Sequence, residues 1–173
     1  MAGKKKHRYE YLNEFKVNDT GGYEFKGSHY IMEAQGNQWK MWLFLVGCVG
    51  TVVVAGFVPC GGMYNSFYVI LPYAIEACLA AYAVYVNARI ALAKGKMRDY
   101  VYEKTVPRVN PLFTILDICA LMSACGEIIH LLATSFAQAT MSGVFIALQC
   151  AAVVCAGGYL TSFRSIKWNR LCK

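Results

Sequence analysis

The sequence predicts an all-α membrane protein: a four-transmembrane-helix bundle made of two helical hairpins, with both termini in the cytoplasm. Three observations lead to this fold class. Hydrophobic residues make up 57% of the 173 residues, residues 41–75 and 128–163 contain no Asp, Glu, Lys or Arg, and all 17 Lys and Arg side chains fall outside these two windows. Because one bilayer crossing needs roughly 20 apolar residues, each uncharged window is too long for one span and suits two.

Residues 1–40 are expected to form a cytoplasmic segment, with a β-hairpin at 9–30 and an interfacial segment at 31–40. In "YEYLNEFKV" apolar and charged residues alternate, "NDTGG" supplies turn residues, and "YEFKG" resumes the alternation. An isolated hairpin is marginal in water, so this one should rest on the bundle, on lipid headgroups or on a partner. Trp39 and Trp42 beside Lys40 are typical of the lipid interface and should anchor the first span.

The four spans are placed at about 41–59, 66–90, 112–134 and 141–163. Two short uncharged stretches, "PCGGMYNS" and "TSFAQATMSG", have the composition of turns between helices. Residues 89–111 should continue the second helix and end at Pro107 and Pro111, which break the helix before the third span. Residues 164–173 are expected to form a basic cytoplasmic tail, so that the transmembrane domain covers 41–163.

The net charge of +7 is informative because of where the charges fall. Residues 1–40 hold seven basic and five acidic side chains, residues 89–111 hold six and two, and residues 164–173 hold four and none. This positive-inside pattern predicts a multi-pass plasma-membrane protein with both termini in the cytoplasm. The basic residues flank spans instead of covering a folded face, which disfavours nucleic-acid binding. They could also bind anionic lipid headgroups, although orientation alone explains them.

The eight cysteines do not suggest a disulfide framework. Six of them fall inside predicted spans, Cys172 is cytoplasmic, and only Cys60 could face the outside. The sequence has no CxxC motif, which argues against a quinone-linked thiol oxidase. We expect the cysteines to be small helix-packing residues.

Helical spacing arranges the small and polar residues of three spans into stripes that should face protein. The stripes are Glu76, Ala80, Ala83 and Asn87 in the second helix; Ala120, Ser123, Ala124, Glu127 and His130 in the third; and Ser142, Gln149, Ala152 and Ala156 in the fourth. The first helix has Gly47, Thr51 and Ala55 at small-xxx-small spacing and no ionisable acid or base.

Depth in the membrane decides which polar side chains can meet. Counted from the outer turns, Glu76 and Gln149 lie roughly 15 Å deep and Glu127 roughly 10 to 12 Å deep, with His130 one turn further out. These residues are expected to form one polar layer in the outer half of the bundle. Asp117 should lie near the cytoplasmic edge, paired with Arg108 or Asn110.

Two interpretations of this layer remain open. In the structural one, the carboxyls are protonated or hydrogen-bonded and fix the helix register. In the functional one, Glu76 and Glu127 bind a cation or relay a proton, since two close carboxyls cannot both ionise cheaply. His130 would then be the outer entry point of the path and Asp117 the inner exit.

Metal and cofactor sites are not predicted. Glu127 and His130 have the Glu-x-x-His spacing of a carboxylate-bridged di-metal bundle, but such sites use this pair twice together with two further Glu. A b-type haem needs two intramembrane histidines and fails on the same count.

The tetraspan layout resembles that of many small bacterial inner-membrane proteins. Small multidrug exporters also have four spans, but they carry their essential carboxylate in the first helix, where this chain has none, so the resemblance stops at span count. We expect a non-enzymatic transporter or the membrane subunit of a larger assembly, in contact with the lipid bilayer. A protein partner or a second copy could bind through the small-residue helix faces or the N-terminal hairpin.

The alternative is a membrane-embedded enzyme that acts on a lipid or another membrane-soluble substrate. Such an enzyme needs a reactive group of side chains at the membrane boundary. The sequence shows no Ser/His/Asp arrangement, paired metal motif or phosphate-binding Gly loop.

Overall fold

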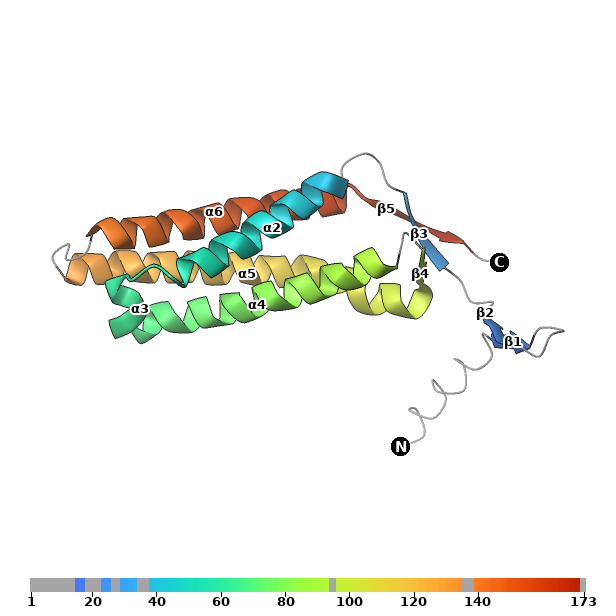
Figure 1. Ribbon diagram of the computed structural model, residues 1–173, viewed down its shortest axis with the longest axis horizontal. Coiled ribbons are helices and arrows are strands. Elements are labelled where there is room, and N and C mark those ends of the chain that lie inside the picture. Colours follow the sequence, from blue (N-terminus) through green and yellow to red (C-terminus); the bar gives the residue numbers. More distant parts are fainter. Residues whose placement is uncertain are drawn as a thin grey trace, which may run out of the picture.

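The computed structural model describes residues 15–17, 23–25, 29–33, 38–93, 96–134 and 139–171. The chain is mostly helical, and its helices run side by side along one direction (Figure 1). They are α2 (Gln38–Ala55), the short α3 (Gly61–Asn65), α4 (Phe67–Leu92), α5 (Asp99–Ala133) and α6 (Ala139–Arg164). The largest contacts join α2 to α6, α4 to α5, and α5 to α6.

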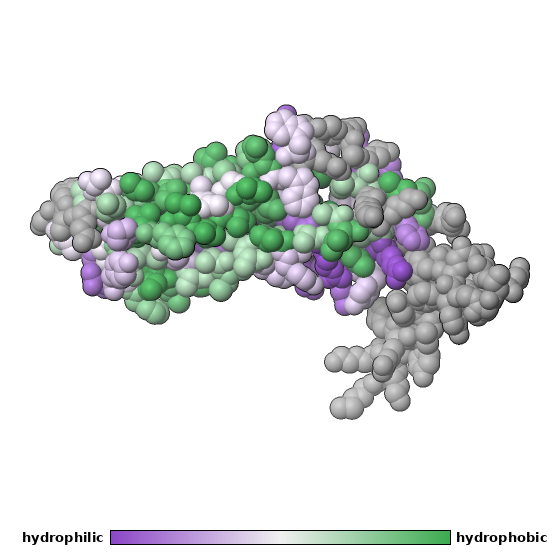
Figure 2. Space-filling model, in the orientation of Figure 1, coloured by the Kyte–Doolittle hydropathy of each residue, from purple (hydrophilic) through white to green (hydrophobic). Residues whose placement is uncertain are grey.

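Three of these helices, α4, α5 and α6, are long and apolar enough to cross a membrane, while α2 is a shorter apolar helix. Many large apolar side chains lie exposed on the bundle, among them Ile129, Leu132 and Val154. Figure 2 shows hydrophobic residues over most of the helical part of one face, with hydrophilic residues gathered near the end that carries the strands. Soluble monomers rarely expose apolar patches of this extent, so the surface suits contact with lipid.

The predicted first span, 41–59, extends past the end of the helix, because α2 covers Gln38–Ala55. Pro59 has no backbone N–H to donate and biases the preceding residue towards extended backbone, which explains why the helix does not continue through the turn. The predicted turn region contains α3, which leads through Ser66 directly into α4.

The prediction that Pro107 and Pro111 break the helix before the third span is wrong. The helix α5 runs without interruption through both prolines. Each proline removes a hydrogen bond to the carbonyl four residues earlier, but both lie on the exposed side of the helix, where those carbonyls can be solvated. The opposite side holds Val109 and Phe113, which are fully buried and fix the helix against the bundle.

A three-stranded antiparallel sheet lies at one end of the bundle (Figure 1). Its central strand is β3 (His29–Glu33), flanked by β4 (Lys96–Arg98) and β5 (Lys167–Leu171). In its register Tyr30 is opposite both Met97 and Arg170. The helical connection predicted at 89–111 is interrupted by β4, which lies between α4 and α5. The segment predicted as a tail, 164–173, contains β5.

Aromatic contacts fix this sheet to the beginning of α5. Tyr30 of β3 stacks on Tyr102 with ring centroids 3.8 Å apart, and Trp168 of β5 meets the same ring edge-on at 5.3 Å. Arg170 adds an ion pair of 2.8 Å to Asp99 in the first turn of α5. The segment before α2, the connection between α4 and α5, and the segment after α6 are thereby joined at one end of the bundle.

The predicted N-terminal hairpin falls only partly on described residues. The strands β1 (Phe15–Val17) and β2 (Tyr23–Phe25) pair antiparallel, with Phe15 opposite Phe25. Residues 9–14 and 18–22 lie outside the described residues. The last two residues of the expected hairpin, His29 and Tyr30, belong instead to β3 of the other sheet. Of the expected interfacial segment, Trp39 is exposed in the first turn of α2.

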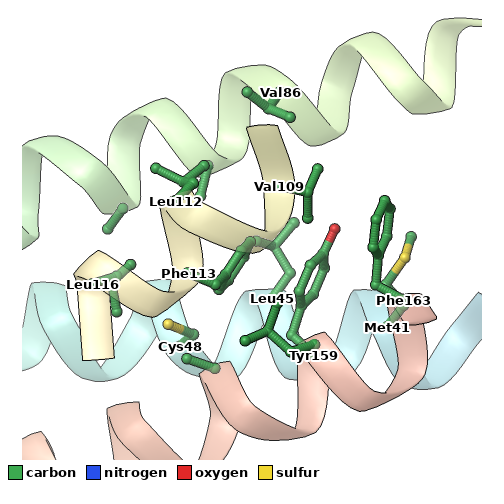
Figure 3. Packing of buried hydrophobic residues seen from close by; sticks show 14 of the residues in the cluster. Met41, Leu45, Cys48, Val86, Val109, Leu112, Phe113, Leu116, Tyr159 and Phe163 are labelled. Carbon is green, nitrogen blue, oxygen red and sulfur yellow. The ribbon is translucent and has the colours of Figure 1, made fainter. Parts of the chain in front are cut away.

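The bundle core is formed by apolar side chains from all four long helices (Figure 3). Phe113 of α5 and Tyr159 of α6 stack at its centre, with ring centroids 4.1 Å apart. Every member of the three predicted small-and-polar stripes is buried except His130, which is half-buried, so the prediction that these stripes face protein is confirmed.

The seven described cysteines are free thiols, and Cys60 is fully buried instead of facing the outside.

The contact between α2 and α6 depends on the small size of Gly158. A Cβ at this position would lie 2.6 Å from Cε1 of Phe44, whereas a Cβ at the neighbouring Gly157 would have no atom within 4 Å. We expect the free energy of unfolding of the Gly158→Ala variant to be about 1 to 3 kcal/mol lower than that of the Gly157→Ala variant. The reason is that the added methyl group at position 158 must displace the Phe44 ring. Thermal unfolding in detergent measures the difference, and equal melting of the two variants would contradict this packing.

Candidate functional site

Most of the buried and half-buried polar side chains between the helices fall into three groups along the length of the bundle. The α3-end group consists of Glu127, Ser142, Ser66 and His130; the central group of Glu76 and Gln149, with Asp117 beside it; and the sheet-side group of Asn87 and Tyr159. Along α4, Ser66, Glu76 and Asn87 follow one another at intervals of roughly 15 Å and 16 Å. The groups therefore lie at three separate depths.

In the α3-end group, Glu127 is fully buried and accepts hydrogen bonds from two other elements at one carboxyl oxygen, while its other oxygen, Oε2, has no partner among the described residues. The Ser142 hydroxyl of α6 donates to Oε1 at 2.5 Å, and the Gly62 backbone N–H of α3 donates to the same oxygen at 3.5 Å. Gly62 must lack a side chain, because a Cβ there would lie 1.9 Å from Oε2 of Glu127. The carboxyl of Glu127 thus holds α3, α5 and α6 together.

The other pair of this group joins α4 to α5. The Ser66 hydroxyl and Nδ1 of His130 lie 2.8 Å apart and share a hydrogen bond. Ser66 directly precedes α4 but does not cap it with its side chain. Ser66, His130 and Glu127 do not form a chain of hydrogen bonds like that of a serine, a histidine and an orienting acid, because the bonded oxygen of Glu127 accepts from Ser142 and Gly62.

The central group contains the least satisfied polar atoms of the bundle. Glu76 of α4 has no exposed surface and Gln149 of α6 has 1%. Neither oxygen of Glu76, and neither the nitrogen nor the oxygen of the Gln149 amide, has a hydrogen-bond partner among the described residues. The Gln149 amide is the hydrogen-bonding neighbour of the Glu76 carboxyl, although the positions of their atoms fall short of strict hydrogen-bond geometry.

Asp117 of α5 is half-buried beside this central group. It acts electrostatically on Glu76 and on the Cys48 thiol of α2, and its buried oxygen Oδ1 has no partner among the described residues. The expected hydrogen bond or ion pair of Asp117 with Arg108 or Asn110 is not formed among the described residues. Because α5 begins at Asp99, Asp117 lies about 27 Å along the helix.

The central group is also uncompensated in charge. The sequence places no Lys or Arg between Phe67 and Ala88 of α4, between Val109 and Ala133 of α5, or between Ala139 and Phe163 of α6. A buried polar atom that makes no bond costs about 1 to 3 kcal/mol of stability. The carboxyl and the amide oxygen of the central group are suited to hold a proton or a hard cation.

The sheet-side group is satisfied by its own members. The Tyr159 hydroxyl donates to Oδ1 of Asn87 at 2.5 Å, and Nδ2 of Asn87 donates to the Ala83 carbonyl at 2.9 Å. Figure 3 shows the Tyr159 hydroxyl directed from α6 towards α4. Sequence reasoning placed Asn87 on the buried stripe but missed Tyr159, which stands in an apolar run with no pattern that separates it from other core aromatics.

The single polar layer expected from the sequence is divided in the structure. Ser142, which binds Glu127, stands seven residues before Gln149 on α6, so Glu127 lies roughly 10 Å from the depth of Gln149. Glu76 has Gln149 as its neighbour, whereas Glu127 binds Ser142 and Gly62. Among the described residues, no three His, Cys, Asp or Glu side chains are grouped so that they could hold a metal ion.

Sequence reasoning also missed Gly62 and Ser66. Both stand in a stretch interpreted only as a turn, and its Gly and Ser content was the available signal that a close approach or a side-chain bond could occur there.

Comparisons of the chain with known protein families, with curated proteins and with solved structures gave no match.

The contrast between Glu76 and Glu127 predicts opposite effects on stability. Glu127→Leu should lower the free energy of unfolding by about 1 to 3 kcal/mol, because it leaves the donors of Ser142 and Gly62 buried without an acceptor. Glu76→Leu should keep or raise stability, because it replaces unbonded polar atoms by apolar ones of similar size. Thermal unfolding in detergent tests both, and a Glu76→Leu protein as unstable as Glu127→Leu would assign Glu76 a structural role.

Proposed function

We propose that the chain is a plasma-membrane protein with four crossing helices, α2, α4, α5 and α6, which moves protons or small cations through its bundle. In this proposal both termini lie in the cytoplasm. The observation that carries the transport function is the buried carboxyl of Glu76, whose oxygens fall short of hydrogen-bond geometry with the neighbouring amide of Gln149.

The pairing of the sheet supports an even number of crossings. In sequence, α2 and α4 lie between β3 and β4, and α5 and α6 lie between β4 and β5. Strands that share hydrogen bonds must lie on the same side of a membrane. If α4 crosses once, the stretch from α2 to α3 must also cross, and the 18 residues of α2 span about 27 Å against a hydrocarbon thickness of about 30 Å.

The basic residues support the cytoplasmic location of the sheet. Arg98, Lys167 and Arg170 belong to its strands, while Arg89, Lys104 and Arg164 stand in the adjoining turns of α4, α5 and α6. The opposite end, with α3 and the connection between α5 and α6, has no Lys or Arg in its sequence. This asymmetry follows the positive-inside rule.

Cysteine labelling tests this orientation. In a Cys172→Ser background, Tyr64→Cys and Ser165→Cys place thiols at exposed positions at opposite ends of the bundle. We expect a membrane-impermeant maleimide to label Tyr64→Cys in intact cells, and Ser165→Cys only after permeabilisation. The buried native Cys60 should stay unlabelled in both. The reverse pattern of labelling would refute the orientation.

Transport is supported by the absence of a structural reason for Glu76. A carboxyl that bonds across a helix contact stabilises the bundle, as the bonds of Glu127 illustrate. Glu76 is buried, and its oxygens fall short of hydrogen-bond geometry even with the neighbouring Gln149 amide. Ionisable residues placed so in a membrane bundle line the paths of ions and protons in pumps and transporters.

Flux measurements in proteoliposomes test this function. With a pH gradient across the membrane and an alkali-metal salt outside, the wild-type protein should dissipate the gradient faster than protein-free liposomes do. Glu76→Gln should reduce the rate to that of protein-free liposomes, while the exposed Glu103→Gln on α5 should keep the wild-type rate. Wild-type flux equal to that of protein-free liposomes, across several cations, would refute transport.

The sheet favours a second candidate function, that of a membrane subunit in a larger assembly. In the described part of the chain, β4 and β5 are edge strands, and edge strands can be extended by a strand from a partner. Co-purification from native membranes would test this candidate. A stoichiometric partner that is lost when Asn169→Pro disturbs β5 would support it.

A further inference from the structure

We propose that the first turns of α5 bind an anionic phospholipid from the leaflet on the sheet side, with Lys104 and Arg108 at its phosphate. This inference goes beyond the proposed transport function and does not depend on it. It rests only on the crossing of a membrane by α5, for which this helix is long and apolar enough.

Lys104 and Arg108 are exposed cations on one side of α5. They stand four residues apart, so their side chains are neighbours along one face of the helix. Nζ of Lys104 lies 4.1 Å from the centroid of the Tyr100 ring and donates to the Tyr100 hydroxyl, which is a neutral partner. Among the described residues, neither cation forms an ion pair with an acid. Two neighbouring positive charges therefore remain for an external anion.

The acids of the same region do not neutralise this pair. Asp99 is bound to Arg170 at 2.8 Å. Glu103 is exposed, but at 100° per residue it lies about 100° from Lys104 and about 140° from Arg108 around the helix axis. Charge complementarity therefore favours an anionic lipid over a neutral one.

The position of the two cations along α5 suits the headgroup layer. The stretch from Leu112 to the end of the helix at Ala133 extends about 33 Å, close to the hydrocarbon thickness of about 30 Å. Arg108 and Lys104 precede this stretch by one and two helical turns. Their long side chains can keep the charged ends among the headgroups while the stems lie along the helix.

An apolar stripe continues from the cations into the hydrocarbon. Ile115, Ile118 and Met122 are each about half exposed. At 100° per residue they lie within the same arc of about 80° as Lys104 and Arg108. A lipid whose phosphate meets the two cations can lay one acyl chain along this stripe. A free phosphate gains nothing from the stripe, so the arrangement favours the lipid.

Lipid binding to the purified full-length protein in a neutral detergent tests this site. Dioleoylphosphatidylglycerol is compared with dioleoylphosphatidylcholine, which has the same acyl chains and no net charge, and the wild type should bind the anionic lipid more tightly. Each basic side chain near an anionic lipid contributes about fivefold in affinity. Lys104→Gln and Arg108→Gln should therefore each lower the affinity for the anionic lipid about fivefold, and the two together about 25-fold. Lys104→Arg should keep it.

The matched control is the double variant Arg164→Gln with Lys167→Gln, which removes the same charge from exposed positions at the same end of the bundle. It should bind the anionic lipid as the wild type does. Thermal unfolding without lipid identifies any variant that has lost its fold, and if the Lys104 and Arg108 double variant melts early, the single variants measure the site on their own.

Three results would each overturn the inference: equal affinity of the wild type for the two lipids, unchanged affinity in the Lys104 and Arg108 variants, or an equal loss in the matched control. Displacement of the lipid by inorganic phosphate would assign the cations to a free anion and also overturn it. Liposomes that show no ion flux would refute transport and leave this lipid site standing.

Discussion

The pairing of β3 with both β4 and β5 is the constraint on which the arrangement of this bundle depends. It joins three segments that are far apart in sequence and places them at one end of the helices. Each helical hairpin must therefore return to the side from which it started. The stacking of Tyr30 and Trp168 on Tyr102 transfers this constraint from the strands to α5, so that the sheet and the bundle are one packed unit.

Within the bundle, the polar groups differ in how far their burial is compensated by hydrogen bonds. Asn87 has partners at both its oxygen and its nitrogen, and Glu127 has them at one of its two carboxyl oxygens. In the central group, neither oxygen of the fully buried Glu76 meets hydrogen-bond geometry among the described residues. A buried polar atom without a bond lowers stability, so the central group costs the fold more than its neighbours do.

Much of this architecture could be predicted from the sequence, because the membrane imposes strong rules on composition. The uncharged windows located the apolar helices, and the spacing of Glu76, Ala80, Ala83 and Asn87 identified a buried face of α4. Helical periodicity depends only on local geometry, which a single sequence displays. The same rules separated Glu127 and His130 from the lipid-facing side chains around them.

The remainder depends on contacts that local pattern does not encode. The strands β4 and β5 are short, and their order comes from pairing with β3 across most of the chain. The continuation of α5 through Pro107 and Pro111 is decided by tertiary packing on its inner side, which overrides the local preference for a break.

The length of α5 has a mechanical consequence. At about 1.5 Å per residue its 35 residues extend roughly 52 Å, well beyond a hydrocarbon layer of about 30 Å. The sheet binds the first turns of this helix through an ion pair to Asp99 and ring stacking on Tyr102, whereas Asp117 lies further along the same helix. A force applied to the sheet is therefore transmitted along α5 towards Asp117, and the helix should bend most easily at the two prolines between them, each of which lacks one backbone hydrogen bond.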